Sequence, residues 1–221
     1  MEDCVRYGDS IVLESCESSE HLFLGIVRRS EGRRNPMLLS TEVAEPGKHH
    51  ASDYQWRVLP VVGSKRRWGD CVSFADRIRL QLVDDRGNSR MLAVSHLDNR
   101  SVMAERRPGK MDACTWWVSY TSELKAGRGG SMAPAGDPAQ HLEYGTANYM
   151  ALVNGARYLS ATDDQYRILR KRTVLLNELP VTSAAAWWRV HRSMSDVVPL
   201  VPQVSSERPL QETVLRSLSL A

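Results

Sequence analysis

Three segments centred on tryptophan decide the fold of this chain: Tyr54-Gln55-Trp56-Arg57-Val58, Thr115-Trp116-Trp117-Val118 and Trp187-Trp188-Arg189-Val190. A motif that recurs three times along a chain is typical of repeat architectures, so we expect three copies of one structural unit. The aligned indoles are Trp56, Trp116 and Trp188, one in each copy. Each is expected in a shared core, where an indole buries on the order of 150 to 250 Å².

Three further strands are predicted in each copy from β-branched or alternating apolar runs bounded by turn formers such as Asn154-Gly155. A four-strand unit of this size cannot bury its own apolar face, and a closed barrel of three units also removes open sheet edges. The sequence therefore predicts an all-β fold, a β-trefoil of three four-stranded repeats with pseudo-threefold symmetry. The expected strands, besides the tryptophan strands, are 11–14, 21–25, 37–40, 77–82, 90–94, 101–104, 149–153, 157–161 and 166–169.

Two segments lie outside the predicted repeats, which span about 5–62, 69–121 and 145–192 of a trefoil domain at 1–192. Residues 122–144 are rich in glycine and proline and are expected to form a flexible loop. Residues 193–221 are expected to form an extended tail that ends in a short amphipathic helix, with Leu210, Val214 and Leu218 on its apolar face. Such a helix is marginal alone in water, so it should dock on its own trefoil or on a partner.

Several segments resemble the β-trefoils of the MIR and fascin type, in which a Gly-Asp-x-Val-x-Leu start, a Tyr-Leu-Ser-type strand and a closing Trp-x-Val recur. The resemblance covers about residues 5–192 and implies a cytosolic domain that recognises protein, glycan, inositol phosphate or filament surfaces. The sugar-binding trefoils of the ricin B type close each copy with Gln-x-Trp, and that glutamine is absent from all three copies here. The segments that carry the resemblance are Tyr7-Gly8-Asp9-Ser10-Ile11-Val12-Leu13, His21-Leu22-Phe23-Leu24, Gly155-Ala156-Arg157-Tyr158-Leu159-Ser160-Ala161 and Trp187-Trp188-Arg189-Val190.

The four cysteines, Cys4, Cys16, Cys71 and Cys114, show no CxxC spacing, and we expect them to be reduced thiols that pack as small apolar residues. The six histidines show no metal-ligand spacing, and no hydrolase or phosphate-loop motif is present, so no catalytic residue, metal or cofactor is predicted. No apolar run is long enough to span a membrane. These features favour a cytoplasmic protein, in which a cytoskeletal association is one option.

Basic clusters and two tryptophans are the candidate binding residues. A net charge of +3 is too weak to argue for nucleic acid, but convergent basic clusters can hold an anion. We hypothesise a non-catalytic interaction or structural subunit that docks into a larger protein assembly, whose contact surface could be acidic, as on a filament. The alternative is a ligand-binding module for an inositol phosphate, lipid headgroup or glycan. The residues singled out are Trp117, Trp187, Arg28, Arg29, Arg66, Arg67, Arg170, Lys171, Arg172, Leu210, Val214 and Leu218.

Overall fold

The computed structural model describes residues 3–16, 21–26, 38–44, 50–83, 87–119, 140–162, 173–177 and 184–197. In this part of the chain every regular element longer than one turn is a strand, so the predicted all-β class is confirmed. The strands are β1 (Ser10–Ser15), β2 (Phe23–Ile26), β3 (Leu38–Ala44), β4 (Trp56–Pro60), β5 (Arg77–Val83), β6 (Ser89–Val94), β7 (Val102–Glu105), β8 (Trp116–Ser119), β9 (Gly145–Asn154), β10 (Arg157–Thr162), β11 (Thr173–Asn177) and β12 (Trp188–His191). The short 3-10 turns are η1 (Ala51–Tyr54), η2 (Met111–Cys114), η3 (Ala184–Ala186) and η4 (Met194–Asp196).

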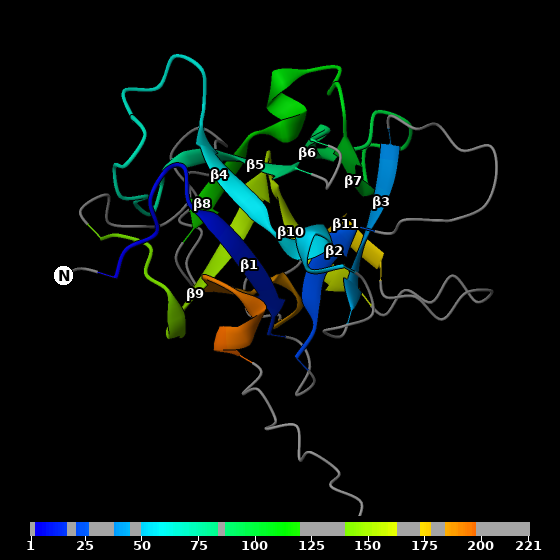
Figure 1. The fold of residues 1–221 in the computed structure, drawn as a ribbon. Helices are drawn as coiled ribbons and strands as arrows, with labels where there is room; N and C mark the ends of the chain where they lie inside the picture. Colours follow the sequence, from blue (N-terminus) through cyan, green and yellow to red (C-terminus); the bar gives the residue numbers. More distant parts are fainter. Residues whose placement is uncertain are drawn as a thin grey trace, which may run out of the picture.

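Six strands close into a barrel. Strand β1 pairs with β4, β4 with β5, β5 with β8, β8 with β9, β9 with β12, and β12 returns to β1, all antiparallel. The other six form the hairpins β2–β3, β6–β7 and β10–β11, which β3 joins by pairing with both β7 and β11. Figure 1 shows β2, β3, β7, β10 and β11 gathered beside the barrel strands β1, β4, β8 and β9. A closed ring leaves these barrel strands without an exposed edge.

One hydrogen bond recurs three times in the core. The indole N–H of Trp56 donates to the carbonyl of Leu24 at 3.0 Å, that of Trp116 to Leu92 at 3.0 Å, and that of Trp188 to Leu159 at 3.1 Å. All three indoles are fully buried in a single apolar cluster. Each tryptophan is thus tied to the hairpin strand of its own predicted copy, as the sequence comparison requires.

A second threefold pattern links three segments outside the strands by backbone hydrogen bonds. The amide of Val5 donates to Leu142, that of Leu142 to Val72, and that of Val72 back to Val5, each at 2.8 Å. All three side chains are buried in the same core cluster. Leu142, near the C-terminal end of the predicted loop 122–144, is therefore a core residue; residues 120–139 lie outside the described residues.

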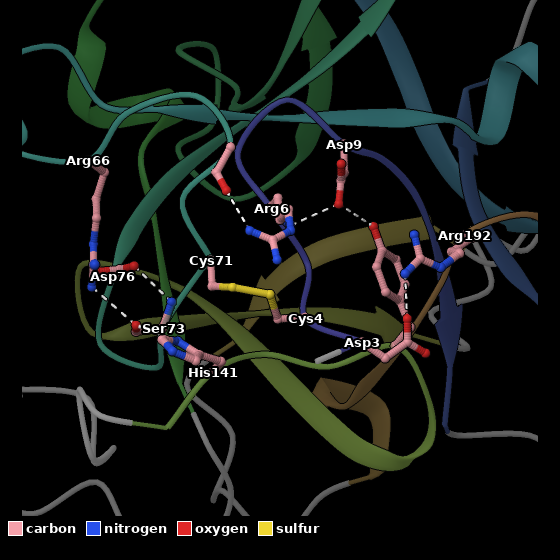
Figure 2. Close-up of a disulfide and its surroundings, with 12 residues drawn as sticks. Asp3, Cys4, Arg6, Asp9, Arg66, Cys71, Ser73, Asp76, His141 and Arg192 are labelled. Carbon is pink, nitrogen blue, oxygen red and sulfur yellow. Dashed lines mark hydrogen bonds and ion pairs between the residues drawn. A yellow bond between two sulfur atoms is a disulfide. The ribbon is translucent and has the colours of Figure 1, made fainter. Parts of the chain in front are cut away.

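The expectation of reduced thiols is wrong for two of the four cysteines. Cys4 and Cys71 form a disulfide with their Cα atoms 5.9 Å apart, which Figure 2 shows as the yellow bond close to Arg6. Each cysteine directly precedes a member of the backbone ring, Val5 or Val72, so the fold brings together two residues that are 67 positions apart. Cys16 and Cys114 are free, and burial raises the pKa of the Cys16 thiol to about 11.

One strand prediction and the tail need separate comment. The expected strand 166–169 falls outside the described residues, and the strand of the third hairpin is β11, later in the chain. Met194 and Val197 pack against the buried residues Val12, Phe23 and Tyr54, so the tail begins on its own barrel. Residues 198–221, with the predicted helix, lie outside the described residues. Within the described ranges no helix is long and apolar enough to cross a membrane.

Candidate functional site

The fold brings together some of the residues singled out from the sequence. Arg66 and Trp117 line one pocket, and Trp117 and Trp187 are both half-buried against one small apolar cluster. Arg67 is exposed and does not line this pocket. The remaining candidates lie outside the described residues: Arg28, Arg29, Arg170, Lys171, Arg172, Leu210, Val214 and Leu218.

The pocket of Arg66 and Trp117, which we call the basic pocket, has a volume of about 450 Å³. The connection between β4 and β5 supplies most of its wall, and β8 supplies Trp117. Its volume lies in the range of small-molecule sites. The lining residues are Ser64, Lys65, Arg66, Asp70, Ala75, Asp76, Arg77 and Trp117.

Arg66 is held in place before any ligand arrives. Its Nε donates to Asp76 at 3.0 Å and its Nη2 donates to the hydroxyl of Ser73 at 3.1 Å, as Figure 2 shows. The other oxygen of Asp76 accepts from the amide of Ser73 and from the phenol of Tyr7. Burial, together with the charge and hydrogen bond of Asp76, raises the pKa of Tyr7 well above its ordinary value, so it stays a neutral donor. A guanidinium held by two partners loses little conformational freedom on binding.

Arg77 and Trp117 form a second element of the basic pocket. The Arg77 guanidinium lies 5.4 Å from the centre of the Trp117 ring, a cation–π geometry. Trp117 rests in turn on the cluster of Ala151, Val153, Tyr158 and Ala186, which fixes the indole from behind. Among the described residues Arg77 forms an ion pair with Asp112 at 3.8 Å, and that carboxylate is almost fully exposed. Lys65 is exposed and makes no ion pair with any residue in the described ranges.

A second pocket, of about 420 Å³, holds a buried carboxylate between two histidines. Glu14 on β1 accepts from His21 at 2.6 Å and from His191 on β12 at 2.8 Å, and Arg189 lies 3.7 Å away. Burial by itself raises the pKa of Glu14, but the hydrogen bonds from both histidines and the attraction of His191 and Arg189 outweigh it and leave that pKa below its ordinary value. The lining residues are Asp3, Glu14, His21, Tyr144, Gly145, Arg189, His191, Arg192, Asp196 and Val197.

The charged groups of this second pocket form ion pairs and hydrogen bonds with neighbouring side chains. Arg192 pairs with Asp3 and lies 4.0 Å from the centre of the Tyr144 ring, while Asp196 accepts from Ser193. Both oxygens of Glu14 accept hydrogen bonds, so the cluster links β1 to β12 and to the segment that precedes β2. No group of three or more metal-ligating side chains occurs among the described residues. Of the two pockets, the basic pocket is the one with cationic groups available to a ligand.

Sequence reasoning missed Arg77, Glu14 and the two histidines beside Glu14. A signal for Arg77 exists, because Phe74-Ala75-Asp76 repeats the Tyr7-Gly8-Asp9 start and Arg77 follows directly. Glu14 and His191 are 177 positions apart, and only the closure of β1 on β12 brings them together. No local sequence pattern predicts that contact.

No protein-family model and no curated protein matches the chain. Among solved structures, it is similar to a Caenorhabditis elegans protein of unknown function from structural genomics, with a TM-score of 0.58 and 14% identity over 86% of this chain and 96% of that one. It is also similar to the SDF2-like protein from Arabidopsis thaliana, with a TM-score of 0.58 and 18% identity over 85% of this chain and 94% of that one. At these identities the likeness shows a shared fold and carries no function.

Proposed function

We propose that this chain is a non-catalytic β-trefoil that binds an anionic ligand in its basic pocket. The trefoil assignment is supported by the three equivalent tryptophan bonds and by the cyclic backbone bonds of Val5, Leu142 and Val72. It is supported as well by the likeness to the SDF2-like protein and by the resemblance of the repeat motifs to MIR-type trefoils.

The ligand proposal rests on one observation. Lys65, Arg66 and Arg77 line one open pocket. Of its two carboxylates, that of Asp76 already accepts hydrogen bonds from Arg66 and Tyr7. Asp70 accepts from the amide of Arg67. Guanidinium and ammonium groups in this arrangement suit phosphate or sulfate groups. The volume suits a small polyanion such as an inositol phosphate.

The hypothesis of docking into an assembly was based mainly on the amphipathic helix predicted in the tail, residues 193–221. The described start of that tail, Met194 and Val197, packs on the chain's own barrel. This favours the option in which the tail docks on its own trefoil. The described residues therefore support the ligand-binding function better than docking through the tail.

The disulfide bears on the compartment. Disulfides persist in oxidising environments and are rare in the cytosol. The cytoplasmic location expected from the sequence assumed reduced thiols, and the Cys4–Cys71 bond removes that assumption. Trapping the thiols of the native protein with a maleimide before lysis decides between an oxidising and a reducing compartment, because only reduced Cys4 and Cys71 would be labelled.

The ligand proposal is tested by calorimetry with inositol hexakisphosphate, with unphosphorylated inositol as the negative probe. A ligand at 100 times its Kd adds about 2.7 kcal/mol to stability, so the Tm should rise by roughly 5–10 °C. Lys65→Ala and Arg77→Ala should each weaken binding about tenfold, because each removes a charged contact.

The matched control is Arg57→Ala, which removes the same charge from an exposed position on β4 that does not line the pocket. It should bind like the unaltered protein. No binding by the unaltered protein, or equal binding by all three variants, would contradict the proposal.

A further inference from the structure

Two exposed apolar side chains lie on the connection between β4 and β5, the segment that also supplies most of the basic pocket. Val62 is 76% exposed and Trp68 is 61% exposed, two of the four large apolar side chains that stand out at the surface of the described residues. Between them lie Lys65 and Arg67, both exposed, and Arg66. Figure 1 shows this connection, coloured from cyan to green, projecting from the barrel.

The loop presents Trp68 on a rigid support. The ring of Trp68 packs on Gly8 so closely that a Cβ there would lie 2.5 Å from a ring carbon. The next residue, Gly69, is tied by its amide to Tyr7 and by its carbonyl to the guanidinium of Arg6, at 2.9 and 2.8 Å. A tryptophan held with most of its surface in water is already arranged for a partner, and little entropy is lost when it binds.

We propose that this connection docks on an anionic membrane surface, with Val62 and Trp68 entering the interface and Lys65, Arg66 and Arg67 meeting lipid phosphates. This inference rests on the proposed function, because the basic pocket supplies the headgroup site. Tryptophan is enriched at membrane–water interfaces, and basic residues beside it are attracted to the negative surface of anionic lipids. The charge pattern of the loop matches that surface: three basic residues in a row, with Asp70 the nearest acid in sequence.

Vesicle sedimentation tests the proposal, with phosphatidylcholine alone compared with phosphatidylcholine containing about 20% phosphatidylserine or a phosphoinositide. The unaltered protein should bind the anionic vesicles and leave the neutral ones in the supernatant. Trp68→Ser should lower partitioning about tenfold, and each charge removed by Lys65→Ala or Arg67→Ala about fivefold. Val62→Ser, at an even more exposed site, provides a second apolar variant that leaves the Gly8 contact intact.

Leu97→Ser is the matched control, because Leu97 is 70% exposed on the separate β6–β7 connection. It should sediment like the unaltered protein, and equal losses in Leu97→Ser and Trp68→Ser would overturn the proposal. Binding of free inositol hexakisphosphate without vesicle binding would overturn this inference and leave the proposed function standing; failure of both would overturn both. Binding of a single-stranded oligonucleotide in place of vesicles, lost in Trp68→Ser, would assign the loop to nucleic acid.

Discussion

The three buried tryptophans should respond alike when each is replaced by phenylalanine. The change removes the N–H that satisfies the carbonyl of Leu24, Leu92 or Leu159 and leaves that carbonyl without its partner in a dry core. An unsatisfied buried acceptor costs about 1–3 kcal/mol. The smaller ring leaves about 40 Å³ empty, which adds about 1 kcal/mol at 24 cal/mol per Å³.

Each of Trp56→Phe, Trp116→Phe and Trp188→Phe should therefore lower the free energy of unfolding by about 2–4 kcal/mol, equivalent to roughly 5–15 °C in Tm. Urea unfolding followed by far-ultraviolet circular dichroism measures this without the altered fluorescence interfering. The control is Trp68→Phe, at a ring that is 61% exposed and makes no bond of this kind with the described residues; it should change stability by less than about 0.5 kcal/mol. If one of the three core variants costs as little as the control, the three sites are not equivalent and the trefoil reasoning is refuted.

Four further predictions test other parts of the structure. The Cys4–Cys71 disulfide closes a loop of 67 positions, so reduction or Cys4→Ser/Cys71→Ser should cost roughly 4 kcal/mol and lower the Tm by about 10 °C; an unchanged Tm under reductant would contradict the pairing. The pKa of Glu14 is lowered in the folded state, so its ionised carboxylate stabilises the fold above the ordinary carboxyl pKa, and this stabilisation is lost as pH falls through the lowered pKa. Glu14→Gln should therefore destabilise the protein at pH 7 by about 1–3 kcal/mol, and the difference in unfolding free energy between the two proteins should shrink in acid. A difference that stays constant with pH would contradict this prediction. Burial raises the pKa of Glu105 despite the attraction of His96, so its ionised carboxylate destabilises the folded state, and this cost disappears as pH falls through the raised pKa. Glu105→Gln should therefore stabilise the protein at pH 7 by about 1 kcal/mol, the opposite sign to Glu14→Gln. Gly8→Ala should destabilise the protein and shift the emission of Trp68, because Gly8 has φ +104° and the added Cβ meets that ring; native stability in this variant would contradict the packing.

Eleven of the twelve strands in the described residues overlap predicted ones, because the tryptophan segments are local and recur three times; β11 is the exception. Trp56, Trp116 and Trp188 lie where the alignment places them, each followed two residues later by a buried valine. The buried position of Leu142 was not predictable, since it follows a stretch of glycine and proline that is typical of a loop. In the predicted second repeat, Ala75 has a positive φ of +68°, as Gly8 and Gly145 do in the other two, and an alanine at this position makes the repeat harder to recognise in the sequence.

The candidate site was predictable only in part, for a physical reason. Basic runs and paired tryptophans are visible in sequence, so Arg66 and Trp117 were found. Their convergence with Arg77 depends on β5 pairing with β8, which sets Arg77 opposite Trp117 in the barrel. The disulfide and the contact of Glu14 with His191 depend likewise on closure of the barrel across 67 and 177 positions. Contacts of this range leave no local pattern.

The most direct test of the binding site follows the six indole N–H signals of ¹⁵N-labelled protein by NMR while inositol hexakisphosphate is added. The basic pocket predicts that the Trp117 signal and the amides of residues 64–77 shift together, while Trp56, Trp116 and Trp188 stay in place in the core. Shifts confined to the surroundings of Glu14 and His191, or an unchanged Trp117 signal at saturation, would contradict the account.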